Sequence, residues 1–499
     1  MAVIDLGSNS FRLVVFSYVP GRWWKRTDEI YEPVRVGAGQ EEGGPLAPEP
    51  MERALETVEL FAHFCRATGI DRVRPLATSA IREAANREQF CAAARERAGL
   101  EIEVLSRAEE AHYGYLAAVN STTLDDGVAL DIGGGSMQLT QVVSRRARAA
   151  GSWRLGTVVS TERFLANDKV KPKHVKALRE HVRAELGSAP WLRGDARRLA
   201  GLGGTVRNLA AAVMLAEDLP TFGVQGFAVP REALDDLVDQ LAGLSPAERR
   251  KVRGIKPERG DLILAGALVV QTVMDVGGFE ALEVTEAGLR EGAFFETLLE
   301  GEEPPLFGDV RAASVRNLAV QYHADVVHTD HVAALALQVW DALAAAGVHP
   351  GRADERELLQ ASALLHDIGT AVDYDDHHKH SRYLVLNAGL PGFTPRETAL
   401  IGQACRYHRK GQPTLGAFSA LMRKGDEALL LRCSAVLRLA EQLERPRDQT
   451  VQETSVAVEN GCVRLRLQAE KDVSISRWAA QRQGDLFERA FGRELSVTD

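Results

Sequence analysis

The sequence predicts an α/β fold over about the first 300 residues, then an all-α region and a small α+β tail. Strand and helix patterns alternate up to this point, which is typical of layered α/β proteins. The run Gly301-Glu302-Glu303-Pro304-Pro305 then breaks any regular element, and the pattern from Arg311 to Leu443 is helical. Alternating stretches on both sides of Asn460-Gly461 indicate a hairpin in the tail.

Length and composition narrow the class of protein. The chain has 499 residues, of which 45% are hydrophobic and 26% charged, and its net charge is −9. This composition excludes collagen-like, largely disordered and disulfide-scaffold proteins. The length predicts several domains, which we expect at residues 1–122, 123–300, 306–447 and 448–499. The acidic balance argues against a nucleic-acid partner, because proteins that bind nucleic acids are usually basic.

The cysteine and hydropathy patterns predict a cytoplasmic protein. Five cysteines are scattered without a close pair, as expected of reduced thiols. The longest apolar run, Leu262 to Val270, is shorter than the roughly 18 residues that a membrane span needs. The N-terminus enters a strand pattern at once, without a basic or apolar leader. We therefore expect no membrane partner.

Individual elements follow from local patterns in chain order. Val3–Leu6 and Arg12–Phe16 are predicted to be two strands joined by a turn. Apolar residues at helical spacing predict a helix over Pro50–Thr68, and Val73–Thr78 is predicted to be a strand that enters a turn. In the tail, Trp478–Phe491 has a helical pattern.

An internal repeat indicates a phosphate site. Val3–Ser10 recurs as Ala129–Ser136, each an apolar strand that ends in an Asp followed by a small-residue turn and a Ser. Glycines let backbone N–H groups close around an anion, and Ser adds a hydroxyl donor. A third such turn is Ala200–Thr205. We predict two homologous hairpins that face each other across a cleft and hold a phosphoryl group and a metal between Asp5 and Asp131.

Further strings accompany the repeat in chain order. They are DLGSNSFRL (5–13), ATSAIREAAN (77–86), EEA (109–111), DIGGGS (131–136), GGT (203–205) and GLREG (288–292). The turns resemble those of the duplicated actin-like ATPase fold (ASKHA, ribonuclease H-like), which sugar kinases and Hsp70 share. More narrowly, the chain resembles the exopolyphosphatase/guanosine pentaphosphate phosphohydrolase (Ppx/GppA) family over most of residues 1–300.

The resemblance implies an activity and its catalytic residues. The family releases terminal phosphate from linear polyphosphate, or the 5′ γ-phosphate of guanosine pentaphosphate (pppGpp), with Mg²⁺; Mn²⁺ is the other metal we expect. It implies that Asp131 binds the metal with Asp5 facing it. Glu110 matches the glutamate that activates the attacking water, although its neighbour Glu109 is an alternative. The resemblance also favours a homodimer.

Phosphate-binding candidates come from the turns and from three arginines. A planar guanidinium can form bidentate hydrogen bonds with two phosphate oxygens. Small polar residues in turns supply hydroxyl and N–H donors. The alternative for each arginine is an ordinary ion pair on the surface or between domains. The candidates are Ser8, Asn9, Ser10, Arg12, Thr78, Arg82, Gly134, Gly135, Ser136, Gly204, Thr205 and Arg290.

One residue departs from the family pattern. The family string usually ends in Glu (DIGGGSxE), whereas this chain has Gln138. That Glu helps to hold the metal and the attacking water, and Gln138 keeps an acceptor oxygen without the charge. We therefore expect a weakened hydrolase, and we expect that a Glu at this position would raise the rate and lower the Mg²⁺ requirement.

A second metal site is expected in the histidine-rich helical region. The string Leu364-Leu365-His366-Asp367-Ile368-Gly369 resembles an HD phosphohydrolase helix. The resemblance implies His328 and Glu441 as further ligands, although Asp is usual at the latter position. His and carboxylate ligands suit Mn²⁺, Fe or Zn²⁺. Related polyphosphatases have a decayed pair here, which favours a structural or polyphosphate-guiding role as the alternative.

These observations predict an exopolyphosphatase-type phosphoanhydride hydrolase. A pppGpp 5′-phosphohydrolase is an alternative, because both substrates present a terminal phosphoanhydride. A weakly active regulator that binds polyphosphate or a nucleotide is a second alternative, because of Gln138. An HD-type nucleotide phosphohydrolase with a vestigial N-terminal half is a third.

Overall fold

The computed structural model describes residues 1–41, 43–166, 170–194, 198–459 and 461–498. The chain divides into two compact units, Met1–Val310 and Arg311–Asp499. The four domains expected from the sequence form a finer division, and their inner boundaries stay predictions.

The first sheet of the N-terminal unit carries the first turn of the repeat. Its strands are β1 (Ala2–Leu6), β2 (Phe11–Val19), β3 (Trp23–Glu32), β4 (Val73–Ala77) and β5 (Glu103–Val104). They lie in the order β3-β2-β1-β4-β5, with β1 antiparallel to β2 and parallel to β4. In the β1–β2 hairpin Asp5 lies directly opposite Arg12.

The second sheet repeats this arrangement. Its strands are β6 (Gly127–Ile132), β7 (Met137–Val143), β8 (Arg146–Trp153), β9 (Leu199–Leu202), β10 (Ala228–Pro230) and β11 (Ala281–Val284). They lie in the order β10-β11-β9-β6-β7-β8, so β8-β7-β6-β9 matches β3-β2-β1-β4. Asp131 lies opposite Gln138 in the β6–β7 hairpin, as Asp5 lies opposite Arg12. The predicted sequence repeat is therefore a repeat of the fold.

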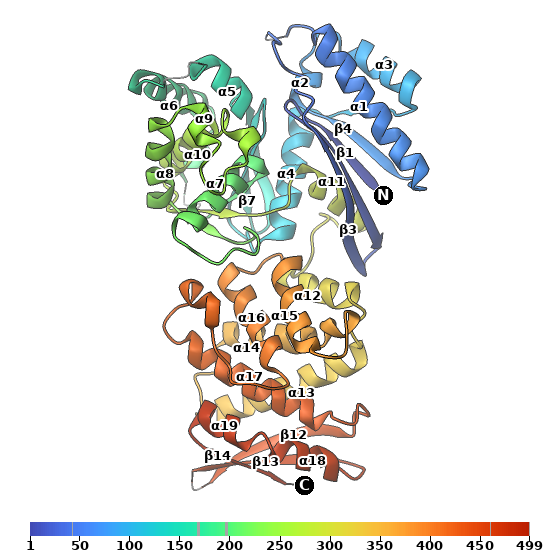
Figure 1. The fold of residues 1–499 in the computed structure, drawn as a ribbon, viewed down its shortest axis with the longest axis vertical. Helices are drawn as coiled ribbons and strands as arrows, with labels where there is room; N and C mark the ends of the chain where they lie inside the picture. Colours follow the sequence, from blue (N-terminus) through green and yellow to red (C-terminus); the bar gives the residue numbers. More distant parts are fainter. Residues whose placement is uncertain (42, 167–169, 195–197, 460, 499) are drawn as a thin grey trace. The chain divides into compact units, whose positions relative to one another are not determined.

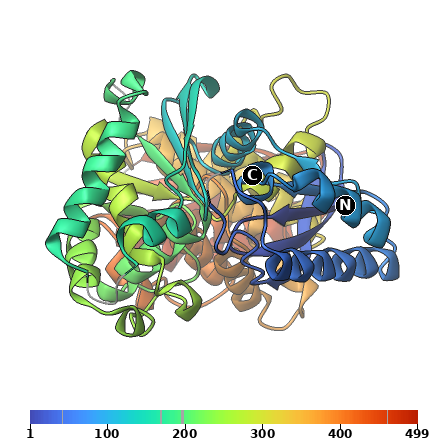
Figure 2. The same cartoon turned by 90° about the horizontal axis from the view of Figure 1, so that it is seen from above.

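Helices cover both sheets of this unit (Figure 1). They are α1 (Pro48–Ala67), α2 (Ser79–Arg82), α3 (Arg87–Ala98), α4 (Arg107–Ser121), α5 (Thr157–Phe164), α6 (Pro172–Leu186), α7 (Gly203–Ala216), α8 (Arg231–Gly243), α9 (Pro246–Arg249), α10 (Ile263–Gly277) and α11 (Leu289–Leu298), with short 3-10 turns at Pro190–Arg193 and Pro257–Arg259. Seen from above, the two sheets with their outer helices form two halves of the unit (Figure 2).

Helices α4 and α11 join the two halves. They pack against each other, α4 contacts β6, β7 and β8, and α11 contacts β1 and β2. Their shared core contains stacked aromatic rings, with Phe16 and Phe294 4.1 Å apart between centroids. Burial of such apolar area is the main stabilising contribution here, at about 25 cal/mol per Å². Residues that α4 presents to the cleft are thus held between the two sheets.

The third expected turn, Ala200–Thr205, differs in kind from the two hairpins. It joins β9 directly to α7, which begins at Gly203. Gly203 has a φ of +93°, which favours glycine because a Cβ is strained there. Gly203 and Gly204 at this helix start line the cavity between the two hairpins, and the N-terminus of a helix favours an anionic ligand.

The second unit is helical, as predicted from Arg311 to Leu443. Its helices are α12 (Val310–Gln321), α13 (Val326–Ala345), α14 (Ala353–Leu365), α15 (His377–Ala388), α16 (Pro395–Tyr407) and α17 (Asp426–Leu443), with 3-10 turns at Ile368–Ala371 and Gly416–Leu421. One core includes buried side chains of these helices, among them Trp340, and of the tail.

The tail forms a small α+β layer. Strands β12 (Val451–Glu459), β13 (Cys462–Ala469) and β14 (Glu494–Thr498) make a sheet in which β12 and β13 are antiparallel. Asn460 of the expected hairpin turn lies outside the described residues. The expected helix over Trp478–Phe491 is two helices, α18 (Ser474–Gln481) and α19 (Gly484–Phe491). The break lies next to Gly484, whose helix propensity is low.

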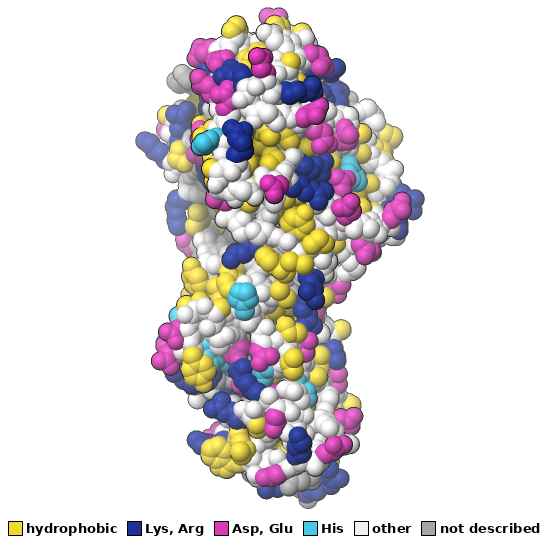
Figure 3. All heavy atoms as spheres, turned by 90° about the vertical axis from the view of Figure 1, so that its right-hand side faces the viewer, with side chains coloured by type: hydrophobic (Ala, Val, Ile, Leu, Met, Phe, Trp, Pro, Cys, Tyr) yellow, Lys and Arg dark blue, Asp and Glu magenta, His cyan; other side chains and the backbone are white. Residues whose placement is uncertain are grey.

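No helix within the described residues is long and apolar enough to cross a membrane. On the face shown in Figure 3, Lys and Arg side chains lie among Asp and Glu side chains.

Candidate active site

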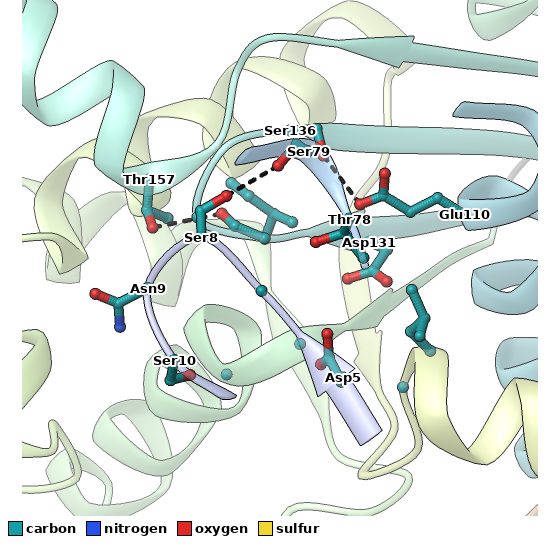
Figure 4. Close-up of a pocket in the computed structure, with 18 of the residues that line it drawn as sticks. Asp5, Ser8, Asn9, Ser10, Thr78, Ser79, Glu110, Asp131, Ser136 and Thr157 are labelled. Atoms are coloured by element: carbon teal, nitrogen blue, oxygen red, sulfur yellow. Dashed lines mark hydrogen bonds between the residues drawn. The ribbon is translucent and has the colours of Figure 1, made fainter. Parts of the chain in front are cut away.

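A cavity of about 140 Å³ lies where the two hairpin turns meet (Figure 4). Figure 4 shows Asp5, Asp131, Glu110 and the Ser8–Ser10 turn around it. Since a water molecule takes roughly 30 Å³ of liquid, this volume suits a terminal phosphoryl group with a few waters. The rest of a longer substrate would lie outside the cavity.

Two carboxylates face this cavity from equivalent strands. Asp5 is the last residue but one of β1, and Asp131 is the last residue but one of β6. Burial raises the pKa of Asp5 to about 6, against the opposing effect of Arg290. Burial also raises the pKa of Asp131 to about 7, and the neighbouring charges of Glu110 and Asp5 add to the rise. Buried acids that repel one another in this way favour a bound cation.

Four arginines line the same cavity. They are Arg12, Arg207, Arg259 and Arg290. The Nη1 atom of Arg290 is buried and has no hydrogen-bond partner among the described residues. Burial lowers the pKa of Arg290, but the nearby acids Glu291 and Asp5 outweigh it, so the net shift is upward. Burial and the charge of Arg290 lower the pKa of Arg207 to about 10. This concentration of guanidinium groups fits a polyanionic ligand.

Glu110 is held at the cavity by two donors. It lies on α4 and is only 7% exposed. Arg82 Nη1 donates to its Oε2 at 2.7 Å, and Ser136 Oγ donates to its Oε1 at 3.0 Å. Each carboxylate oxygen keeps a further lone pair, which can accept a hydrogen bond from water.

Glu109 has a different role. Its side chain accepts a hydrogen bond from the N–H of Ser106, and Ser106 Oγ accepts from the N–H of Glu109. This capping box starts α4 and leaves Glu109 exposed. Of the two glutamates, Glu110 lines the cavity.

Most of the expected phosphate-binding residues lie around this cavity. Nine line it: Ser8, Asn9, Ser10, Arg12, Thr78, Gly134, Ser136, Gly204 and Arg290. Arg82 reaches the site through Glu110. Gly135 lies where the two turns touch, because a Cβ there would come within 2.9 Å of Ser8 Oγ. Thr205 is buried on α7, against Gly266.

Sequence reasoning missed several lining residues. They are Gly7, Ser79, Ile132, Gly133, Thr157, Gly203, Arg207, Arg259, Gly288 and Leu289. Arg207 lies one turn of α7 after Gly203, the first residue of the GGT string, so this spacing could have indicated it from the sequence. Arg259 lies in a 3-10 turn far along the chain, next to Gly204. No local string marks it as a cleft residue.

Gln138 is buried in the cavity wall, with 3% of its surface exposed. Its Nε2 donates to Ser136 Oγ at 2.9 Å and to Ser152 Oγ at 3.3 Å. The residue that departs from the family string is therefore hydrogen-bonded to the serine that contacts Glu110.

The second unit contains a buried cluster of histidines and acids. His328 Nε2 and His366 Nε2 lie 3.1 and 3.2 Å from Glu441 Oε2, and His366 Nε2 lies 3.6 Å from Asp367 Oδ1. The four expected ligands thus come together. Two further histidines of this region, His377 and His408, lie 3.3 and 3.6 Å from Asp367 Oδ1, although they were not among the four expected ligands.

Protonation at this cluster is set by burial and by opposite charges. Burial lowers the pKa of His366, but Asp367 and Glu441 outweigh it and raise the pKa to about 9. Burial lowers the pKa of His408 to about 3. Arg447 Nη2 donates to Asp367 Oδ2 at 2.6 Å. The triads His328–His366–Asp367 and Asp367–His377–His408 each place three ligand atoms within 4.8 Å of one another.

Two duplicated sheets with facing Asp-bearing hairpins, a cleft between them and a buried Glu define a hydrolase of the actin-like type that acts on phosphoryl groups. The family model of the Ppx/GppA phosphatase family matches residues 23–301, and that of its domain III matches residues 310–482. The chain belongs to the Ppx/GppA phosphatase family. It is a phosphoanhydride hydrolase.

Individual relatives agree with this assignment. A guanosine-5′-triphosphate,3′-diphosphate pyrophosphatase of Vibrio vulnificus is 28% identical over 479 residues, which are 94% of this chain and 92% of the relative. The crystal structure of an Aquifex aeolicus Ppx/GppA family member is 27% identical, with a TM-score of 0.53, over 60% of this chain and 98% of that chain. An exopolyphosphatase from Cytophaga hutchinsonii shares the fold at 22% identity and a TM-score of 0.56, over 60% and 97% of the two chains.

Proposed function

We propose that the protein releases terminal orthophosphate from inorganic polyphosphate by attack of water on the last phosphoanhydride bond. The observation that carries this proposal is the position of Glu110. It lines the cavity with Asp131 and is held by Arg82 and Ser136. A carboxylate in this setting has the geometry of a general base for an attacking water.

Binding of the substrate falls to the turns and the arginines. Backbone N–H groups of the turns Ser8–Ser10 and Gly134–Ser136, together with the hydroxyls of Ser8 and Ser10, surround the terminal phosphoryl group. Arg290 has a buried Nη1 without a hydrogen-bond partner among the described residues, 3.6 Å from Glu29 Oε1. It binds equatorial oxygens and neutralises charge that shifts during the transfer. The small volume of the cavity fits a phosphate at the end of a chain.

A divalent metal, Mg²⁺ or Mn²⁺, fits the acids of the cleft. Asp131 and Asp5 are buried and have raised pKa values, so a cation would relieve their mutual repulsion. Mg²⁺ usually binds one or two carboxylates together with substrate phosphates, which matches this pair better than a full protein cage would. When bound, the ion supplies Lewis-acid polarisation of the phosphoryl oxygens.

The chain's own residues then divide the reaction between them. Glu110 accepts a proton from the water whose oxygen attacks the terminal phosphorus. The bond from that phosphorus to the bridging oxygen breaks, and the shortened chain leaves with the electron pair of that bond. The arginines of the cavity stabilise the charge on the departing oxygen. Orthophosphate and a chain one phosphate shorter are the products.

A pppGpp 5′-phosphohydrolase is the second candidate, and one observation favours it. The Vibrio vulnificus relative named for guanosine-5′-triphosphate,3′-diphosphate matches 94% of this chain, including both units. The exopolyphosphatase structure matches only 60% of it. Both substrates end in the phosphoanhydride that the cavity accepts. A weakly active regulator that binds either ligand is the third candidate, motivated by Gln138.

The experiment is orthophosphate release from long polyphosphate, tripolyphosphate and pppGpp, each with Mg²⁺ or Mn²⁺. Faster release from long polyphosphate supports the first candidate, and faster release from pppGpp supports the second. Binding of these ligands without release supports the regulator. The cytoplasmic location and the homodimer stay predictions; light scattering tests the latter.

We also propose a second divalent metal at His328, His366, Asp367 and Glu441 in the helical unit. Buried His nitrogen and carboxylate oxygen ligands fit Mn²⁺, Fe or Zn²⁺. Elemental analysis of the purified protein tests this site. We expect bound transition metal in the wild type and its loss in a His366→Ala/Asp367→Ala variant.

A further inference from the structure

Gln138 and Ser136 form a hydrogen-bonded pair in the wall of the cavity. Gln138 lies on β7, directly opposite Asp131, and Ser136 ends the turn before the same strand. The Nε2 of Gln138 lies 2.9 Å from Ser136 Oγ, and both side chains are buried. Solvent therefore competes little for these groups, and the protein itself decides where each hydrogen points.

The direction of the hydrogen bonds follows from the chemistry of the groups. An amide nitrogen of Gln only donates, so Ser136 Oγ accepts from Gln138. An ionised carboxylate only accepts, so the single hydrogen of Ser136 Oγ is directed to Glu110 Oε1 at 3.0 Å. The Gln138 amide thus donates to a lone pair of Ser136 Oγ. The hydroxyl hydrogen of Ser136 stays free to be donated to Glu110.

The amide itself is fixed from the other side. Gln138 Nε2 also donates to Ser152 Oγ on β8 at 3.3 Å. At the far end of the chain of hydrogen bonds, Arg82 of α2 donates to Glu110 Oε2. The network therefore runs from the second sheet to the helix that follows the first sheet's β4, with Glu110 at its centre.

We infer that Gln138 is a positioning residue, which directs the Ser136 hydroxyl to Glu110 and so holds the catalytic base towards the attacking water. The inference rests on the proposed function of this cleft. It gives the residue that departs from the family string a role of its own, distinct from supplying charge to a metal. A donor at position 138 is what this role needs, and a Glu cannot provide one.

The test compares kcat and KM for tripolyphosphate in three variants. Gln138→Met keeps the length of the side chain and removes the donor, and we expect kcat to fall about fivefold with KM unchanged. Ser136→Ala removes the contact to Glu110, and we expect a fall of about tenfold. The third variant combines Gln138→Met with Ser136→Ala. Because Gln138 acts through Ser136, the kcat of this double variant should be no lower than that of Ser136→Ala alone. Effects that multiply in the double variant would overturn the inference.

Two controls separate positioning from general damage. Gln141→Met lies on the same strand three residues further on, hence on its opposite face, and should keep wild-type kcat. Glu110→Gln is assayed in parallel. If that variant keeps the wild-type rate, the proposed function of the cleft fails. If it is inactive while Gln138→Met has wild-type kcat, only the present inference fails.

Gln138→Glu tests the role of the donor against the role of charge. The added carboxylate should lower the Mg²⁺ concentration that gives half-maximal rate, because Mg²⁺ prefers anionic oxygens. The Ser136 hydroxyl would then face two carboxylates and can donate to only one. These contacts reverse the rise in rate that the sequence pattern predicted for a Glu at this position. We expect kcat at saturating Mg²⁺ to fall below the wild-type value, and a kcat above it would overturn the inference.

Discussion

Arg82 and Glu110 form a buried ion pair, with 2.7 Å between Arg82 Nη1 and Glu110 Oε2. The same Nη1 donates to the carbonyl oxygen of Leu105, so the guanidinium is fixed at the start of α4. A candidate phosphate clamp thus serves as the partner of the candidate base. The proposed chemistry depends on this carboxylate being ionised and held still.

Glu110→Gln should lower kcat about a hundredfold or more, because a general base contributes roughly this factor. The amide keeps the shape of the side chain, so the melting temperature should change little. Glu109→Gln is the matched control on the neighbouring position. Gln at this position can also accept from the N-cap N–H, so the capping box of α4 is kept and kcat should stay close to that of the wild type. The measurement is the initial rate of phosphate release by each variant. A low rate in Glu109→Gln would contradict the assignment of Glu110 as the general base.

Asp131→Asn should inactivate the enzyme and yet stabilise the metal-free protein at pH 8. The pKa of Asp131 is raised to about 7 from 3.8 in the unfolded chain, so ionising it in the fold costs free energy. Stability of the metal-free wild type is therefore fully present near pH 4 and falls as pH rises towards 7. The neutral amide removes this cost, which we expect to be about 4 kcal/mol at pH 8, since one pKa unit corresponds to about 1.4 kcal/mol.

Thermal melts in EDTA at pH 6, 7 and 8 measure this effect. The wild type should lose stability across the series relative to Asp131→Asn. Addition of Mg²⁺ should stabilise the wild type more at pH 8 than at pH 6, because protons and the cation compete for the same carboxylates. An equal Mg²⁺ effect at both pH values would show that these acids do not bind the metal.

Gly135→Ala should impair the approach of the two phosphate turns. A Cβ at this position would meet the hydroxyls of Ser79 and Ser8, whereas a Cβ at Gly134 has contacts of 3.4 Å or more. Crowding of this kind costs about 1–3 kcal/mol. We expect kcat/KM to fall about tenfold or more in Gly135→Ala and clearly less in Gly134→Ala. Equal activity of the two variants would mean that close contact of the turns is not needed.

Arg259→Gln should raise KM for the phosphate substrate about tenfold, since a hydrogen bond to a charged group contributes about 1.5–3 kcal/mol. Arg259 lines the cavity beside Gly204. Arg253→Gln removes a charge of the same sign nearby in sequence, where the side chain is exposed. Steady-state kinetics of the two variants should differ in KM, and an unchanged KM in Arg259→Gln would exclude this arginine from substrate binding.

The fold and the two aspartates could be predicted because their signals are local. The residues of each hairpin are contiguous in the sequence. The repeat of Val3–Ser10 as Ala129–Ser136 therefore indicated the duplicated topology. The choice between Glu109 and Glu110 was also open to sequence reasoning. Ser106 and Glu109 have the spacing of a capping box, which assigns Glu109 to the helix start.

Other residues of the site could not be found in this way. Arg259 comes to the cavity through the packing of a distant 3-10 turn, and no spacing rule connects it to Asp131. The partners of Gln138 were equally hidden, because Ser152 is brought beside it only by the pairing of β7 with β8. In the second unit, His377 and His408 join Asp367 through the tertiary packing of α15 and α16.

The most direct test of the central claim is orthophosphate release from tripolyphosphate with Mg²⁺, measured for Asp131→Asn and for His366→Ala/Asp367→Ala. The claim is that the cleft of the N-terminal unit carries the hydrolysis and the histidine cluster of the helical unit does not. We predict that Asp131→Asn loses nearly all release while the double variant keeps most of it. Loss of release in the folded double variant, with wild-type rates in Asp131→Asn, would contradict the account.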